Sequence, residues 1–273
     1  MDRTVSRIKG PLWPNVPDNT AIKLIGLGGV GGITARYLAT FLASIDRAVR
    51  LVLIDGDSFE PSNATRMLFS DCGNKATTIQ RELLVRLADS SLTLIAVEEY
   101  LTQENIDRLI RDGDIVLLAV DNHATRKLVS DFCANHLEEV CLISGGNDGV
   151  GKDASGRETR GTYGNCQVYI RRAGRDVSPS LTRYHPEIRD PADKNPSDES
   201  CAELVESVPQ ILFANLAAAS AILNAFWLFC CEALHYGELS FDIAEGLMRP
   251  IPLPAPVTTA AFPSSFLPTF HLQ

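Results

Sequence analysis

The sequence predicts an α/β fold: a Rossmann-like, doubly wound, mostly parallel sheet with antiparallel strands added in the C-terminal half. Short apolar segments alternate with helical segments through residues 21–144, which is typical of strand–helix–strand units. A glycine-rich turn joins the first of these strands to the first helix. The chain has 273 residues, of which 45% are hydrophobic and 22% are charged, as in an ordinary folded globule. This length allows one large domain or two small ones.

The individual elements follow from the length and periodicity of the apolar segments. Parallel strands are expected at residues 21–27, 50–54, 92–97, 114–120 and 140–144. Helices are expected at 30–44, 75–88, 102–110 and 124–136, the third of them started by a turn from Thr102 to Asn105. Residues 160–172 alternate in polarity and should form an antiparallel strand, and residues 238–243 should form a last strand.

Three segments lack such patterns. Residues 1–20 are expected to form an arm, because prolines at 11, 14 and 17 block regular structure. Residues 173–200 are polar and contain four prolines, so we expect a long irregular loop that crosses the domain. Residues 248–273 contain six prolines and are expected to form an extended tail. One domain, residues 21–247, lies between the arm and the tail.

Composition narrows the range of partners and compartments. The formal net charge of −9 gives no general attraction to nucleic acid or to anionic lipid. Residues 211–234 are apolar and long enough to span a bilayer, but the small residues at 217–221 favour a helix packed in the core, so no membrane association is expected. Seven cysteines without paired spacings, and no signal peptide, indicate a reducing, cytoplasmic compartment. No C-x-x-C occurs, so no structural zinc is expected.

The turn after the first strand has the sequence G-L-G-G-V-G. Its glycines are Gly26, Gly28, Gly29 and Gly31. Glycine permits the tight turn and lets backbone N–H groups approach phosphate oxygens at a helix N-terminus. Asp55 ends the second strand, 24 residues after the last glycine, where a carboxylate binds ribose hydroxyls in Rossmann-type sites. The pattern predicts a nucleotide site; the alternative is that the glycines only allow close helix–strand packing.

Further polar residues follow in an order that favours phosphate chemistry. Asp57, Asn63 and Arg66 come after Asp55, Lys75 begins a helix, and Asp121 follows the fourth strand. Two cations offset the charge of a triphosphate, and a carboxylate holds a hard divalent ion such as Mg²⁺. A nicotinamide-dependent oxidoreductase has no need of these cations. Taken singly, each residue is equally well explained as a surface charge or a helix cap.

Together these residues resemble the ThiF/MoeB and ubiquitin-activating-enzyme adenylyltransferases over about residues 21–243. The shared motifs are the glycine loop, the D-x-D run with its later Asn and Arg, a Lys, and Asp121-Asn122 followed by Thr125-Arg126. The small size and the S-D-x-G-x-K-A variant at residues 70–76 are similar to ThiF-type proteins of bacterial PRTRC or ubiquitin-like conjugation operons.

The resemblance implies ATP-dependent adenylation of the C-terminal carboxylate of a ubiquitin-like or sulfur-carrier protein. It also implies a homodimer and a downstream conjugating protein as a further partner. The residue roles that it implies are ribose binding by Asp55, nucleotide binding by Asp57, phosphate binding by Asn63, Arg66 and Lys75, and Mg²⁺ binding by Asp121.

Cys201 stands eight residues before Pro209 and a helix rich in small residues, as in many family members. In the family this cysteine takes the acyl group as a thioester or takes part in sulfur transfer; the alternative is an idle thiol. Cys72, close in sequence to Arg66 and Lys75, is the second candidate. The other five cysteines are interpreted as structural.

The chain departs from the family in three places. Met67 replaces the glutamine that follows the arginine, and the paired C-x-x-C zinc ligands are absent. The N-terminal arginine-rich motif has no clear match, Arg3 and Arg7 being the only candidates. Three alternative functions stay open: adenylation in cofactor biosynthesis, a nicotinamide-dependent oxidoreductase, and an inactive scaffold of the same fold.

Overall fold

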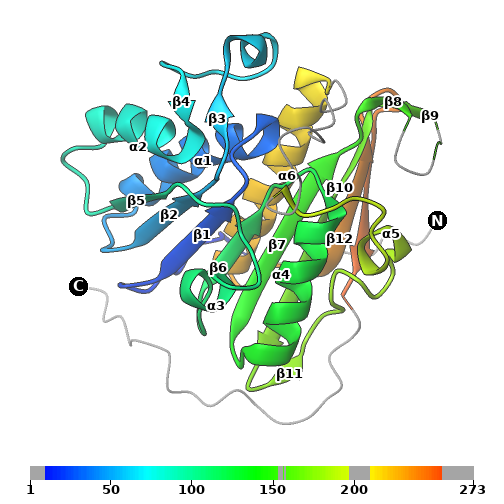
Figure 1. The fold of residues 1–273 in the computed structure, drawn as a ribbon. Helices are drawn as coiled ribbons and strands as arrows, with labels where there is room; N and C mark the ends of the chain where they lie inside the picture. Colours follow the sequence, from blue (N-terminus) through cyan, green and yellow to red (C-terminus); the bar gives the residue numbers. More distant parts are fainter. Residues whose placement is uncertain (1–9, 153–155, 157, 197–209, 254–273) are drawn as a thin grey trace.

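A mixed sheet organises the computed structural model, which describes residues 10–152, 156, 158–196 and 210–253. The strand order is β13-β12-β10-β7-β6-β1-β2-β5, with β11 paired to β10 (Figure 1). The parallel strands are β1 (Ala21–Ile25), β2 (Arg50–Ile54), β5 (Thr93–Val97), β6 (Ile115–Leu118) and β7 (Val140–Asn147). The antiparallel strands are β10 (Tyr163–Arg172), β11 (Arg175–Asp176), β12 (Tyr236–Asp242) and β13 (Leu247–Pro252). The predicted fold class is confirmed.

Helices cover both faces of this sheet, with α4 on one face and α1 and α6 on the other (Figure 1). The helices are α1 (Gly29–Ser44), α2 (Lys75–Arg86), α3 (Ile106–Leu109), α4 (His123–His136), α5 (Pro186–Arg189), α6 (Leu212–Cys230) and the 3₁₀-helix η1 (Pro61–Thr65). Two small ribbons complete the described structure: β3 (Ser58–Phe59) with β4 (Gly73–Asn74), and β8 (Val150–Lys152) with β9 (Glu158–Arg160).

The sheet divides the hydrophobic interior into two clusters. Successive residues of a strand point to opposite faces, so alternate positions enter different clusters. In β2, Leu51 and Leu53 join the cluster that contains α1 and α6, whereas Val52 and Ile54 join the one that contains α3 and α4. Both faces of these strands are therefore buried, which is why the strands appear in the sequence as continuous apolar runs.

The chain order reverses between β1 and β6, because β1 is followed by β2 on one side and β6 lies on the other. In open α/β sheets, ligands bind outside the carboxyl ends of the strands at such a reversal. The glycine loop after β1 and the Asp121 segment after β6 both lie at this edge.

Three expectations need correction. The predicted Thr102–Asn105 turn is present, with the Asn105 side chain accepting from Thr102 N–H (2.8 Å), but the helix after it is only the short α3. The start of the expected proline-rich tail forms strand β13, with Pro250 and Pro252 in the ladder at the sheet edge. The described part of the 173–200 loop contains β11 and α5 rather than irregular chain alone.

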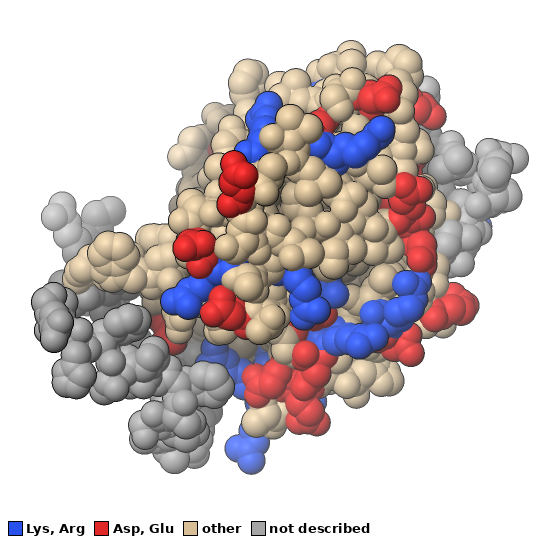
Figure 2. Space-filling model, turned by 90° about the vertical axis from the view of Figure 1, so that its left-hand side faces the viewer, with Lys and Arg blue, Asp and Glu red and all other residues tan. Residues whose placement is uncertain are grey.

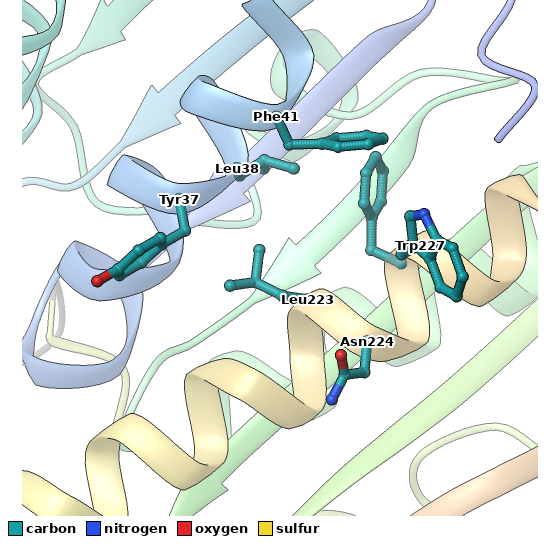
Figure 3. A pocket seen from close by; sticks show the side chains of 7 residues that line it. Tyr37, Leu38, Phe41, Leu223, Asn224 and Trp227 are labelled. Atoms are coloured by element: carbon teal, nitrogen blue, oxygen red, sulfur yellow. The ribbon is translucent and has the colours of Figure 1, made fainter. Parts of the chain in front are cut away.

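Helix α6 is, within the described ranges, the one helix long and apolar enough to cross a membrane. It packs against α1, β7 and β10, and nine of its 19 residues are buried. A small hollow between α1 and α6 is lined by Tyr37, Phe41, Leu223 and Trp227, among others (Figure 3). On the face drawn in Figure 2, acidic and basic side chains are interspersed around an uncharged area, with no broad basic patch on that face.

Candidate active site

The glycine loop connects β1 to α1 in a conformation that requires glycine at two positions. Gly26 has a φ of +83°, and a Cβ there would lie 2.9 Å from both the Ala119 carbonyl and Val120 Cγ1. A Cβ on Gly31 would overlap the Gly26 carbonyl oxygen and lie 2.8 Å from its carbon. The loop therefore packs tightly against the segment that follows β6.

The N-terminus of α1 begins inside this loop. The first α-helical bond there runs from Gly32 N–H to Gly28 O (2.8 Å), so helix geometry supplies no partner to the preceding amides. Gly28 is the N-cap and contributes no side-chain cap. Amides without a helical partner and the positive end of the helix dipole form an arrangement suited to an anion.

Asp55 supports the loop from the end of β2. Its carboxylate accepts hydrogen bonds from Leu27 N–H (2.6 Å) and Asp57 N–H (2.8 Å). Burial raises the pKa of Asp55, and the nearby Lys75 ammonium partly opposes that rise. The residue predicted to bind ribose therefore also fixes the glycine loop.

Lys75 lies almost buried at the first position of α2. Its Nζ forms an ion pair with Asp57 Oδ2 at 2.5 Å, and its N–H donates to the Asp57 carbonyl (2.9 Å). Asn74 is the N-cap of α2 and also donates to the Asp55 carbonyl (2.8 Å). Asn74 is not among the predicted site residues, although an asparagine directly before an amphipathic helix is the usual N-cap signal. The structure thus brings Asp55, Asp57 and Lys75 together.

Asn63 and Arg66 lie on and just after η1. The Asn63 side-chain oxygen accepts from Glu60 N–H (3.0 Å) in a capping box, and Arg66 N–H donates to the Asn63 carbonyl (3.0 Å). The next residue, Met67, approaches the loop: its Cε lies 3.8 Å from the position of a Cβ on Gly28. This segment therefore runs beside the glycine loop, with the Asn63 oxygen engaged in local structure.

Asp121 is exposed at the carboxyl end of β6, two residues after the Ala119 segment that contacts the loop. The carboxylates of Asp55, Asp57 and Asp121 all lie near the Tyr100 side chain, so these three acidic residues share one region. Burial raises the pKa of Tyr100 to about 12, with further contributions from the carboxylates of Asp57, Asp55 and Asp121. The Tyr100 ring also packs on Gly56. Tyr100 is not among the predicted site residues, because no short-range signal in the sequence links it to the site.

The N-terminus of α4 lies next to Asp121. Asp193, from the 173–200 segment, accepts hydrogen bonds from His123 N–H (2.7 Å) and Ala124 N–H (2.8 Å). Arg126 is buried and donates to the Val120 carbonyl (2.9 Å). Burial lowers the pKa of Arg126, and Asp121 opposes that effect. Arg126 thus fixes the backbone immediately before Asp121.

Several residues that the sequence predicts for the site are not brought together with Asp55, Asp57, Lys75 and Asp121. Cys201, Arg3 and Arg7 lie outside the described residues. Cys72 is exposed and has a free thiol. No group of three His, Cys, Asp or Glu side chains suited to a metal ion occurs within the described ranges.

The sheet order and the glycine loop define the class: a Rossmann-like α/β domain with a phosphate-binding type of turn after β1. The model of the ThiF family matches residues 18–237, and the chain belongs to that family.

Individual proteins with similar sequences support the assignment to this family. "Adenylyltransferase and sulfurtransferase MOCS3" of Drosophila yakuba is 32% identical over 154 residues, which is 55% of this chain and 31% of that protein. "SAMP-activating enzyme E1" of Haloferax volcanii is 28% identical over 130 residues, 46% of this chain and 45% of that protein. The chain thus spans less than half the length of either relative.

Solved structures agree on the fold. E. coli MccB in a crystal structure with ATP superposes with a TM-score of 0.60 at 18% identity, covering 88% of this chain and 65% of MccB. At this identity, the likeness concerns the fold alone.

Proposed function

We propose that the protein binds ATP at the glycine loop and adenylates the C-terminal carboxylate of a small ubiquitin-like or sulfur-carrier protein. The main support is the juxtaposition at one sheet edge of the α1 N-terminus, the Asp55–Lys75 group and Asp121. The printed names of the relatives, an adenylyltransferase and a SAMP-activating enzyme, support the same reaction class.

The reaction needs positioning and charge compensation more than covalent catalysis. A carboxylate oxygen of the partner attacks the α-phosphorus, the bond from that phosphorus to the bridging oxygen breaks, and pyrophosphate leaves with the electron pair. Lys75 and Arg66 would offset the negative charge that develops on the leaving group. Asp55 would hold the glycine loop and accept from ribose hydroxyls.

Mg²⁺ fits this site through Asp121. Mg²⁺ usually keeps several waters and binds through one or two carboxylates plus substrate phosphates, so a cluster of protein ligands is not required. Asp121 is exposed at the strand end beside the phosphate loop, as such a ligand should be. When bound, the ion would neutralise phosphate charge.

Asp121→Ala tests this assignment in a pyrophosphate-exchange assay with ATP, Mg²⁺ and candidate small proteins. We expect exchange to be lost and the fold to be retained, because an exposed strand-end carboxylate contributes little packing. Asp131→Ala is the matched control, since Asp131 is a half-exposed carboxylate paired with Lys127 on α4. Normal exchange by Asp121→Ala would contradict the metal role, and no exchange by the wild type with any partner would contradict the proposed reaction.

Two finer parts of the proposal concern transfer and assembly. We propose Cys201 as acceptor of the acyl group, and a homodimer formed through the apolar helical face that includes exposed Tyr37 and Phe213. Light scattering at micromolar concentration should give twice the chain mass; a monomer would contradict the homodimer.

A further inference from the structure

Helices α1 and α6 run parallel, with their N-termini at the same sheet edge. Gly29, at the start of α1, contacts Asn215 near the start of α6. Farther along, the rings of Phe41 and Phe226 meet edge to face, with centroids 6.1 Å apart. The two contacts are separated by nearly the same number of residues on each helix, so the helices lie side by side in one direction (Figures 1 and 3).

The N-terminus of α6 resembles that of α1 in having no side-chain cap. Its N-cap is Ile211, and its first backbone bond runs from Asn215 N–H to Ile211 O (3.1 Å). The amides before Asn215 thus have no helical partner. Helices of 16 and 19 residues therefore direct their positive ends toward one region, which favours an anion there.

Asn215 stands between these two N-termini with an unsatisfied side chain. It is 0% exposed, and neither Nδ2 nor Oδ1 has a hydrogen-bond partner among the residues that the structure describes. Its Cγ lies 3.0 Å from the position of a Cβ on Gly29, and Nδ2 lies closer still. Burying an unpaired amide costs free energy, which leucine of similar size would avoid. The amide is therefore better explained by a ligand than by packing.

We propose that Asn215 is a nucleotide-binding residue, whose amide donates to a phosphoryl oxygen held between the N-termini of α1 and α6. The Gln210 side chain also approaches this point: its Oε1 is 3.3 Å from the same Cβ position on Gly29, on a half-buried side chain, without bonding the Asn215 amide. A phosphoryl group that accepts from the Asn215 amide would displace the Gln210 side chain. The inference rests on the proposed function, because it assigns the same loop to a nucleoside triphosphate.

The test is calorimetric binding of a non-hydrolysable ATP analogue, and of adenosine, to Asn215→Leu and Asn215→Asp. We expect Asn215→Leu to weaken binding of the analogue on the order of tenfold, the effect of losing one hydrogen bond to a charged group. Asn215→Asp, which keeps the size but adds negative charge, should weaken it further. Adenosine has no phosphate, so its affinity should not change.

Asn224→Leu is the matched control on the same helix, because Asn224 already bonds Ser220 Oγ (3.3 Å). Asn224→Leu should leave binding of the analogue unchanged. Asn215→Leu should keep or raise the melting temperature of the free protein. Binding of the analogue within twofold of wild type by folded Asn215→Leu or Asn215→Asp would overturn the inference. So would an equal loss for adenosine. A wild type that binds no analogue would instead overturn the proposed function, and the inference with it.

Discussion

The contact between Gly29 and Asn215 predicts a strong energetic coupling between the two positions. Gly29→Ala places a methyl group on the Asn215 amide, and α6 is too tightly packed to move away. Overpacking of this kind costs about 2 kcal/mol, which lowers the melting temperature of a chain this size by roughly 4–8 °C. Asn215→Ala alone removes an unpaired amide and leaves a small cavity, so its cost should stay within about 1 kcal/mol.

The double variant Gly29→Ala/Asn215→Ala tests this coupling. In the Asn215→Ala background the methyl group has room, so Gly29→Ala should lower the free energy of unfolding by only about 0.5 kcal/mol. The difference from its cost in the wild type is a coupling energy of roughly 1.5 kcal/mol, which urea unfolding of the four proteins measures. Gly28→Ala is the control, because a Cβ there meets only Met67 Cε at an ordinary 3.8 Å. Its cost should be small and unaffected by Asn215→Ala. An equal cost of Gly29→Ala in both backgrounds would refute the argument.

Arg66→Ala and Lys75→Ala should each slow adenylation by about a hundredfold, the usual loss for one charge-stabilising group, and wild-type pyrophosphate exchange by either variant would show that residue to be dispensable. Cys201→Ala should preserve pyrophosphate exchange but abolish a thiol-sensitive adduct with the partner protein on a non-reducing gel; an adduct that persists would move the role to another cysteine. His185 hydrogen-bonds Glu238 (3.0 Å) and Glu187 (2.8 Å), which raises the pKa of His185 above 6.5. Its contribution to stability is therefore complete below pH 6.5 and is lost as the pH rises through the raised pKa, so melting temperatures should fall from pH 6 to 8 in wild type and less in His185→Gln.

The parallel half of the fold could be predicted because its signals are local. A strand buried on both faces is a continuous apolar run, and residues 50–54 are both the predicted and the observed limits of β2. Strand β13 was not predicted, because prolines in sequence suggest irregular chain and only tertiary pairing reveals an edge strand. In residues 102–110 the turn closed by Asn105 was predicted, but the length of the helix after it was not, because α3 has only 4 residues.

In the candidate site, too, residues with local sequence signals could be predicted and residues that depend on tertiary contacts could not. The glycine loop, Asp55 and Lys75 follow from motifs at fixed spacing, and the structure brings them together. Tyr100 and Asn215 reach the site only through distant contacts, so no window of sequence could have assigned them. The predicted roles of individual residues toward ATP and Mg²⁺ stay predictions.

The proline pair in β13 also limits how copies of this domain can associate. Leu253 N–H points inward to the His235 carbonyl (3.0 Å), so by the alternation of an antiparallel ladder the nitrogens of Pro250 and Pro252 face outward. Neither nitrogen has a hydrogen to donate, and the outer rim of the sheet therefore offers carbonyls without matching donors at those positions. A second sheet cannot be added there in continuous register. A dimer that continues the sheet across this edge is therefore disfavoured, and the growth of extended β-assemblies is blocked at this end of the molecule.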